Sequence, residues 1–253
     1  MTGMQATPES QDVRRPLARV PKPGAIAVRP TVGGTETVFV IEDDISVREA
    51  LCGLLKSVGL QVQAFATSVD LLGNGRFGDA SCMVVDIRLP GMSGLDFQAT
   101  LAEAKVNTPL VFMSGHGDVP MTVRAMKAGA VDFLTKPFRD QDMLDAVATA
   151  IERNRARLSA EKATAELHMH LGTLSRRERE TMLLVTTGLM NKQVAGHLGL
   201  CEATVKMYRG KAMKKMGARS LAELARMAEI LGLHAGDGRA QSAVSAGADH
   251  DSL

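Results

Sequence analysis

The sequence lacks tryptophan, and its aromatic residues are limited to one Tyr and seven Phe among 253 residues. Aliphatic side chains and methionine must therefore fill its cores, and a hydrophobic content of 45% suffices for that. Three cysteines, Cys52, Cys82 and Cys201, lie far apart without a CxxC pair or a His/Cys cluster, which argues against a disulfide framework or a zinc site. No stretch approaches the roughly 18 to 20 apolar residues of a membrane span, and the N-terminus has no apolar signal segment. We therefore expect a cytoplasmic protein that does not enter a membrane.

Charge is unevenly distributed along the chain, although the formal net charge is only +2. Acidic residues outnumber basic ones by 5 over residues 36–171, whereas basic residues outnumber acidic ones by 6 over residues 172–234. This asymmetry predicts two domains with different partners, of which the basic one is expected to face nucleic acid. The flanking segments, 1–35 and 235–253, are rich in small residues or proline and show no periodicity, so we expect a disordered arm and a disordered tail.

Four short apolar runs each end in polar or charged side chains. The runs are Thr37–Ile41, Cys82–Val85, Leu110–Met113 and Val131–Leu134. Segments of helical length, with apolar residues three and four apart, separate them. This alternation predicts an α/β fold with a parallel sheet covered on both faces. Because open sheets of this kind bind ligands at the carboxyl ends of their strands, Glu42, Asp43, Asp86, Ser114 and Lys136 should meet at one edge.

The residues expected at this edge suit a divalent cation and a phosphoryl group. Carboxylates crowded together repel one another unless a cation neutralises them, and Mg²⁺ prefers carboxylates together with water and phosphate oxygens. A carboxylate can also attack phosphorus to form an acyl phosphate, while a metal and an ammonium group neutralise the developing charge. Glu42, Asp43 and Asp86 can build such a site, Lys136 supplies the ammonium, and Ser114 can donate a hydroxyl.

Four motifs, in this order, resemble the receiver domains of two-component response regulators. They are Ile41-Glu42-Asp43-Asp44, Val85-Asp86-Ile87-Arg88-Leu89-Pro90-Gly91-Met92-Ser93-Gly94, Met113-Ser114-Gly115-His116-Gly117-Asp118 and Phe133-Leu134-Thr135-Lys136-Pro137-Phe138. The resemblance covers about residues 37–155 and is especially close to the FixJ group from Ser114 to Phe138. It implies a flavodoxin-like, doubly wound sheet of five strands and phosphorylation of Asp86 by a histidine kinase.

The resemblance implies a metal site of neighbouring residues. Asp43, Asp86 and the carbonyl of Arg88 would hold Mg²⁺, and Glu42 would act largely through water. Because three acids stand in a row, Asp43 and Asp44 are an alternative metal pair, but counting from the strand end favours Glu42 and Asp43. Asp44 is then expected to cap the following helix.

The resemblance also implies how phosphorylation is sensed. Ser114 and Phe133 would form the switch pair, in which the hydroxyl turns toward the phosphate and the ring turns inward. Lys136 would bind the phosphate, and its bond to Pro137 would be a cis peptide. His116 is expected to shape its loop rather than to take part in the chemistry.

Two capping-box sequences mark helix starts in the basic segment. Ser175-Arg176-Arg177-Glu178 and Ser220-Leu221-Ala222-Glu223 each place a Glu three residues after a Ser, which satisfies unpaired N–H groups at a helix start. Between them the sequence predicts a short helix over Val194–Leu198, a turn at Gly199–Cys201 and a second helix over about Glu202–Met216. Two short helices joined by a turn within a basic segment indicate a helix-turn-helix.

The second of these helices carries most of the basic residues. They are Lys206, Arg209, Lys211, Lys214 and Lys215, while Val205, Tyr208, Ala212 and Met216 recur three and four apart and can form the inward face. Lys and Arg side chains placed in this way can contact phosphates and guanine edges in the major groove. The charge alone fits a solvated helix face equally well.

Residue motifs favour DNA binding. Leu174–Glu180, Gly188–Ala195, Thr204–Lys206 and Lys214–Met216 with Ser220 resemble LuxR-type domains over about residues 171–234. The resemblance implies an all-α domain of four helices, in which the third enters the major groove and the fourth supports dimerisation. It implies DNA contacts from Lys192, Thr204, Lys206, Met207, Arg209, Lys211 and Lys214.

Three residues depart from the LuxR-type pattern. Cys201 stands where Ser commonly caps the recognition helix, so this cap should be weaker. Tyr208 stands where His is common. Gly210 lies inside the recognition helix, where glycine costs about 1 kcal/mol relative to alanine, and it removes a side chain that can read bases in relatives. The pattern therefore predicts DNA binding without fixing a particular base contact.

Together these features predict a transcriptional response regulator rather than an enzyme. Its expected parts are a disordered arm at 1–35, a receiver domain at 36–154, a linker helix at 155–171, a LuxR-type domain at 172–234 and a disordered tail at 235–253. A histidine kinase would phosphorylate Asp86. The modified protein would form a homodimer, bind promoter DNA and act with RNA polymerase, with activation as the expected direction.

Three alternatives differ from this prediction: two kinds of enzyme and a regulator that does not respond to phosphorylation. A Mg²⁺-dependent phosphatase with an aspartyl nucleophile would need a second Asp two residues after Asp86, where Arg88 stands, and the GxxxxGK[ST] loop of P-loop NTPases is missing. The alternative is a regulator that binds DNA constitutively and whose receiver serves only in assembly. The full set of acidic-site residues argues against it, and DNA binding with and without a phosphodonor separates the two.

Overall fold

The computed structural model describes residues 36–115 and 119–233. The arm and tail expected at 1–35 and 235–253, and His116, lie outside the described residues. The chain divides into two compact units, Met1–Ala156 and Arg157–Leu253. Within the described ranges, no helix combines the length and apolar character needed to cross a membrane.

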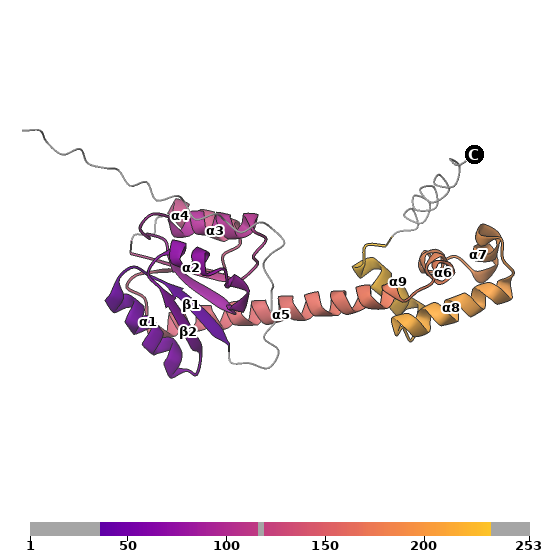
Figure 1. Cartoon of the computed structure of the whole chain (residues 1–253), viewed down its shortest axis with the longest axis horizontal. Helices are drawn as coiled ribbons and strands as arrows, with labels where there is room; N and C mark the ends of the chain where they lie inside the picture. Colours follow the sequence, from indigo (N-terminus) through magenta and orange to yellow (C-terminus); the bar gives the residue numbers. More distant parts are fainter. Residues whose placement is uncertain (1–35, 116–118, 234–253) are drawn as a thin grey trace, which may run out of the picture. The chain divides into compact units, whose positions relative to one another are not determined.

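A five-stranded parallel sheet forms the centre of the first unit (Figure 1). Its strands are β1 (Thr37–Ile41), β2 (Gln61–Phe65), β3 (Cys82–Asp86), β4 (Leu110–Ser114) and β5 (Asp132–Thr135). The spatial order is β2-β1-β3-β4-β5, and every neighbouring pair is parallel. Strands β1, β3 and β4 are buried along nearly their whole length because helices cover both faces. This confirms the predicted doubly wound α/β fold.

Helices pack on both faces of this sheet (Figure 1). They are α1 (Ile45–Ser57), α2 (Ser68–Asn74), α3 (Gly94–Glu103), α4 (Val119–Lys127) and α5 (Asp140–Gly172), with a 3₁₀ turn, η1, at Phe77–Asp79. Helices α1 and α5 cover one face, where Leu55 and Met143 are fully buried. Helices α2, α3 and α4 cover the other, where Leu71, Phe97 and Ala125 are fully buried. The carboxyl ends of the strands are left to the connecting loops.

Four helices follow α5 in the described part of the second unit. They are α6 (Arg176–Thr186), α7 (Asn191–Leu198), α8 (Glu202–Met216) and α9 (Leu221–Ile230). Their shared core consists of aliphatic and methionine side chains, with Met182, Val194, Val205 and Leu224 fully buried. Gly199 ends α7 in the left-handed conformation, with φ of 64°, which allows the tight turn into α8. This confirms the predicted all-α domain, in which α7 and α8 form the helix-turn-helix.

The two predicted capping boxes differ in detail. Ser175 Oγ accepts from Glu178 N, and the Glu178 carboxylate accepts from Ser175 N, so the box at α6 is complete. Ser220 Oγ accepts from Glu223 N in the same way. The Glu223 carboxylate, however, accepts from Arg219 N at 2.7 Å. The reciprocal bond at α9 is therefore made one residue earlier than the motif predicts.

Candidate functional site

Three carboxylates meet where β1 and β3 end. Glu42 and Asp43 follow β1, Asp86 is the last residue of β3, and the two strands are hydrogen-bonded neighbours. Ligand oxygens of the three side chains lie within 4.8 Å of one another. Glu42 and Asp86 are buried, whereas Asp43 is exposed. The structure thus brings together three residues that the sequence places at one sheet edge.

Lys136 reaches this cluster from directly after β5. Its Nζ donates to Glu42 Oε2 and to Asp86 Oδ2, at 2.6 Å in each case. Burial raises the pKa of Glu42 despite the opposing effect of the Lys136 hydrogen bond. Burial by itself lowers the pKa of Lys136, but its hydrogen bonds to Asp86 and Glu42 outweigh burial and leave that pKa raised. The lysine is therefore held as an ammonium between two carboxylates.

An arginine of α1 holds the loop that carries Glu42 and Asp43. Arg48 Nη1 donates to the carbonyl oxygens of Glu42, at 2.6 Å, and Asp43, at 3.0 Å. Asp44 caps α1 by accepting from the N–H groups two and three residues further on, and these bonds lower the pKa of Asp44. The predicted capping role of Asp44 is confirmed. No role was predicted for Arg48, because an arginine on a helix near a strand end can equally well extend into solvent.

A close backbone contact fixes the loop after β3. Arg88 N donates to Asp86 Oδ1 at 2.8 Å, which orients the carboxylate. Gly94, the first residue of α3, donates from its N–H to Ile87 O at 2.9 Å. A Cβ at Gly94 would lie only 2.6 Å from the carbonyl oxygen of Asp86. Sequence reasoning assigned no role to Gly94, since a glycine near a loop signals a turn as readily as a close contact.

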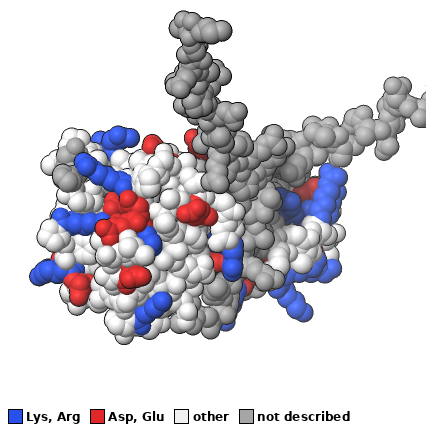
Figure 2. All heavy atoms as spheres, turned by 60° about the vertical axis from the view of Figure 1, so that its left-hand side comes forward, with Lys and Arg blue, Asp and Glu red and all other residues white. Residues whose placement is uncertain are grey.

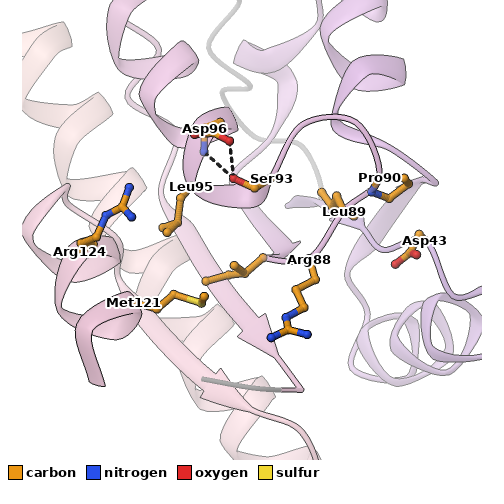
Figure 3. Close-up of a pocket in the computed structure, with 10 residues that line it drawn as sticks. Asp43, Arg88, Leu89, Pro90, Ser93, Leu95, Asp96, Met121 and Arg124 are labelled. Atoms are coloured by element: carbon orange, nitrogen blue, oxygen red, sulfur yellow. Dashed lines mark hydrogen bonds between the residues drawn. The ribbon is translucent and has the colours of Figure 1, made fainter. Parts of the chain in front are cut away.

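An open hollow of about 690 Å³ borders the acidic cluster (Figure 3). Arg88, Leu89 and Pro90 of the loop after β3 are among its lining residues, as is Arg124 of α4. Asp43 also lines it, which opens the exposed side of the carboxylate cluster to this space. An incoming small group therefore has room to approach the site from here.

The two residues predicted as a switch lie on neighbouring strands. Ser114 ends β4, next to β3 and Asp86, and is fully buried. Phe133 on β5 is half-buried and packs against the core beneath α2, α3 and α4. Lys136 N donates to Ser114 O at 2.8 Å, and the peptide bond between Lys136 and Pro137 is cis, as predicted. The backbone of the lysine is thereby attached to the end of β4.

Acidic and basic side chains lie close together on the surface of the molecule. On the face shown in Figure 2, a compact group of acidic side chains lies beside separate basic ones. Clustered carboxylate oxygens are ligands that hard divalent cations prefer. Hydrogen bonds from Arg88 N and Lys136 Nζ fix the orientation of the Asp86 carboxylate within this cluster.

Helices α7 and α8 of the second unit present basic side chains to solvent. Helix α8 buries Val205, Ala212 and Met216 against the other helices. The exposed residues of the two helices include Lys192, Lys206, Met207, Lys211 and Lys214. Thr204 and Arg209, the other predicted DNA contacts, are half-buried.

Two basic residues of α8 are bonded inside the unit. Arg209 Nη1 donates to Asn191 Oδ1 at 3.1 Å, which links α8 to the start of α7. Lys215 Nζ donates to Glu178 Oε2 at 2.6 Å and to Thr173 O at 2.9 Å. The Lys215 hydrogen bond holds the pKa of Glu178 below its usual range. Lys215 belongs to the basic set of this helix but not to its predicted DNA contacts, and in the structure it ties α8 to the start of α6.

Cys201 is the N-cap residue of α8. Its side chain makes no capping hydrogen bond to the described backbone of α8, which confirms the predicted weak cap. The thiol Sγ lies 3.0 Å from Thr204 Oγ1, and this contact lowers the pKa of the thiol. The Thr204 hydroxyl is thus already partnered by the residue that precedes the helix.

Two family models match the chain in the order of its two units. The model described as "Response regulator receiver domain" matches residues 38–148. The model described as "Bacterial regulatory proteins, luxR family" matches residues 172–228. The matched ranges contain every residue predicted for the acidic site and for the DNA interface.

Several known proteins are similar to this chain over most of its length. Nodulation protein W of Bradyrhizobium diazoefficiens is 58% identical over 198 residues, which cover 78% of this chain and 87% of that protein. Response regulator protein TmoT of Ectopseudomonas mendocina is 42% identical over 77% of this chain and 88% of its own. Transcriptional regulatory protein FixJ of Azorhizobium caulinodans is 42% identical over 79% of this chain and 95% of its own length. The solved structure of response regulator StyR superimposes with a TM-score of 0.69 at 44% identity, covering 78% of this chain and 99% of that one.

Proposed function

The chain belongs to the two-component response regulators that join a receiver domain to a LuxR-type DNA-binding domain, and we propose that phosphorylation of Asp86 controls its binding to promoter DNA. Members of this family are transcriptional regulators rather than enzymes, as the sequence predicted, and sensor kinases phosphorylate them. The observation that carries the proposal is the Lys136 ammonium, 2.6 Å from an Asp86 oxygen within a cluster of three carboxylates.

The carboxylate cluster is proposed to bind Mg²⁺, which receiver domains bind at an acidic pocket. Asp43, Asp86 and the Arg88 carbonyl would hold the ion, with Glu42 acting largely through water. Carboxylate oxygens within 4.8 Å of one another can share a single cation. Bound there, Mg²⁺ would help neutralise the charge on the transferring phosphoryl group.

Asp86 is proposed to be the phosphoryl acceptor. One carboxylate oxygen attacks the phosphorus of a phosphohistidine on the kinase, the P–N bond breaks, and an acyl phosphate forms. Lys136 then binds a phosphoryl oxygen, and Ser114 turns its hydroxyl toward another. Phe133, which packs against the core beside α4, turns inward with it.

The response is proposed to reach a second copy of the chain through α4. Val119, Val123 and Met126 recur at helical spacing and are 76%, 42% and 42% exposed. Exposed apolar side chains that share one helix face favour association, so phosphorylation is expected to promote a homodimer. The dimer would bind promoter DNA and act with RNA polymerase in the cytoplasm, with activation as the expected direction. The proposed DNA contacts are Lys192, Thr204, Lys206, Met207, Arg209, Lys211 and Lys214.

The proposal assigns the receiver domain to residues 36–154, a linker helix to 155–171 and the LuxR-type domain to 172–234. It is supported by the division of the chain after Ala156 and by the ranges of the two family matches.

Labelling with acetyl phosphate tests the acceptor. The full chain with Mg²⁺ should gain one phosphoryl group by intact mass, whereas the Asp86→Asn chain, or wild type with excess EDTA, should gain none. Asp44→Asn is the matched control, because this neighbouring acid caps α1 and should not affect labelling. Equal labelling of Asp86→Asn and wild type would refute the assignment.

A gel shift on promoter DNA tests whether phosphorylation of Asp86 controls DNA binding. Wild type should bind more tightly after treatment with acetyl phosphate, and Asp86→Asn should not change. Equal affinity with and without the phosphodonor would favour the alternative, a constitutive DNA-binding regulator whose receiver acts only in assembly.

A further inference from the structure

Of the three carboxylates in the acidic cluster, only that of Asp43 makes no hydrogen bond to the described residues. The Glu42 and Asp86 carboxylates accept from Lys136 Nζ, and Asp86 also accepts from Arg88 N. Metal-binding side chains are normally oriented by such outer contacts, which strengthen metal binding. Because the Asp43 side chain is exposed and lacks them, its orientation has to come from its backbone.

Arg48 of α1 fixes that backbone on both sides of the Asp43 Cα atom. Its Nη1 donates to Glu42 O, in the peptide group before this Cα, at 2.6 Å, and to Asp43 O, in the peptide group after it, at 3.0 Å. One nitrogen atom therefore holds both of the planar groups that meet at Asp43. Since φ and ψ are the only soft torsions between two such groups, the direction of the Asp43 side chain is set as well.

Arg48 is itself attached to the loop that it holds. Its backbone N–H donates to Asp44 O at 2.9 Å in the first turn of α1, and the Asp44 side chain caps the same helix. Within the described residues, the hydrogen bonds of its guanidinium go to backbone carbonyls and not to a carboxylate, although three acids precede the helix. The side chain thus acts on the backbone of the loop.

The charge of Arg48 and its hydrogen bonds have opposite effects on a cation at this site. A guanidinium repels Mg²⁺, but charges close to solvent are largely screened. A ligand that is in place before the cation arrives loses less conformational freedom on binding, and outer contacts of this kind change metal affinity by about tenfold or more. The hydrogen bonds should therefore outweigh the repulsion.

We infer that Arg48 is a positioning residue for Asp43 and that it raises the affinity of the acidic site for Mg²⁺. This inference rests on the proposed function, since it takes Asp43 as a ligand of the ion. It assigns to a residue of α1 a part in metal binding without contact with the metal.

Calorimetric titration of the full chain with Mg²⁺ alone tests the inference on wild type, Arg48→Met and Arg48→Lys. Methionine keeps an unbranched side chain but has neither the charge nor the N–H donors. Lysine keeps the charge on a side chain one bond shorter, without the guanidinium geometry. Lys56→Met is the matched control, because it removes an exposed cation from the last turn of the same helix.

Arg48→Met should bind Mg²⁺ about tenfold more weakly than wild type, Arg48→Lys should lie between the two, and Lys56→Met should match wild type. In labelling with acetyl phosphate, Arg48→Met should need about tenfold more Mg²⁺ to reach half of its maximal rate. Its rate at saturating Mg²⁺ should approach that of wild type. This split separates weaker metal binding from damage to the fold, which lowers the rate at every Mg²⁺ concentration.

The inference is overturned if Arg48→Met binds Mg²⁺ as tightly as wild type, or more tightly, as repulsion alone would predict. It is also overturned if the labelling rate falls without a change in the half-saturating Mg²⁺ concentration. Wild type that binds Mg²⁺ but gains no phosphoryl group on Asp86 would overturn the proposed function alone, because the titration contains no phosphodonor. Wild type that binds no Mg²⁺ would overturn the proposed metal site and the inference together.

Discussion

Replacing Gly94 by alanine should damage the receiver unit more than any comparable change on its surface. The new Cβ would lie 2.6 Å from Asp86 O, 3.0 Å from Ile87 Cα and 3.2 Å from a ring carbon of Phe112. Two of these atoms belong to the backbone, which cannot rotate away. To restore an ordinary contact of 3.4 Å, the Gly94–Asp86 separation must grow by about 0.8 Å.

The expected loss in folding free energy follows from this geometry. Overpacking of a well-packed interior costs about 1 to 3 kcal/mol, and a clash between backbone segments belongs at the upper end. For a unit of this size, about 3 kcal/mol corresponds to a fall of roughly 10 °C in melting temperature. Because the displaced carbonyl belongs to Asp86, labelling by acetyl phosphate should also slow down in the Gly94→Ala chain.

Calorimetry of the full chain measures the effect, since the transition of the second unit serves as an internal reference. Gly53→Ala is the matched substitution in the same unit. A Cβ there meets nothing within 4 Å among the described residues. Gly53→Ala should therefore increase the free energy of unfolding of the receiver unit by up to about 1 kcal/mol and raise its melting temperature. A Gly94→Ala chain that melts no lower than wild type, or two variants whose melting temperatures shift in the same direction, would contradict this prediction.

Two further predictions concern the DNA-binding unit. Lys215→Met removes the hydrogen bonds to Glu178 and Thr173, so the second unit should melt at a lower temperature. Because the folded pKa of Glu178 lies below its ordinary value of 4.5, the pair stabilises the fold above that pH and loses this contribution as pH falls through the lower folded value. The difference in melting temperature between Lys215→Met and wild type should therefore be clear at about pH 7 and shrink at about pH 3; a difference independent of pH would contradict the role of the ion pair. Lys206→Ala and Lys211→Ala should each reduce the slope of log affinity against log salt by about 0.9, measured by anisotropy, if each contacts one phosphate. An unchanged slope would remove that lysine from the phosphate contacts.

The strands show where sequence pattern succeeds and where it does not. Strands β1, β3 and β4 were predictable because burial on both faces requires continuous apolar runs. Strand β2, Gln61–Phe65, was not located from its residues. It lies at the edge of the sheet, is only partly buried, and alternates polar with apolar side chains over too few residues to stand out. Its existence was implied only by the resemblance to receiver domains.

The acidic site, too, was predictable only in part. Glu42, Asp43 and Asp86 were predictable as neighbours, because parallel strands place their carboxyl ends at one edge. The contacts that hold them were not, since Arg48 acts on backbone carbonyls and Gly94 acts by lacking a side chain. In the second unit, Lys215 and Glu178 are 37 residues apart, so only the folded arrangement of α6 and α8 brings this lysine of the basic helix within hydrogen-bonding distance of Glu178.

The bonds of Lys136 suggest how a phosphoryl group on Asp86 would affect residues beyond the site. Its ammonium is shared between Glu42 and Asp86, at 2.6 Å from each. A phosphoryl group adds roughly −1.5 to −2 charges, which draws the ammonium away from Glu42 and toward the phosphoryl oxygens. The backbone of Lys136 is not free to follow independently, because its N–H is bonded to Ser114 O across β4 and β5. If Asp86 is the acceptor, as proposed, the change in charge would act on the two strands that carry Ser114 and Phe133, and through Phe133 on the core beneath α4.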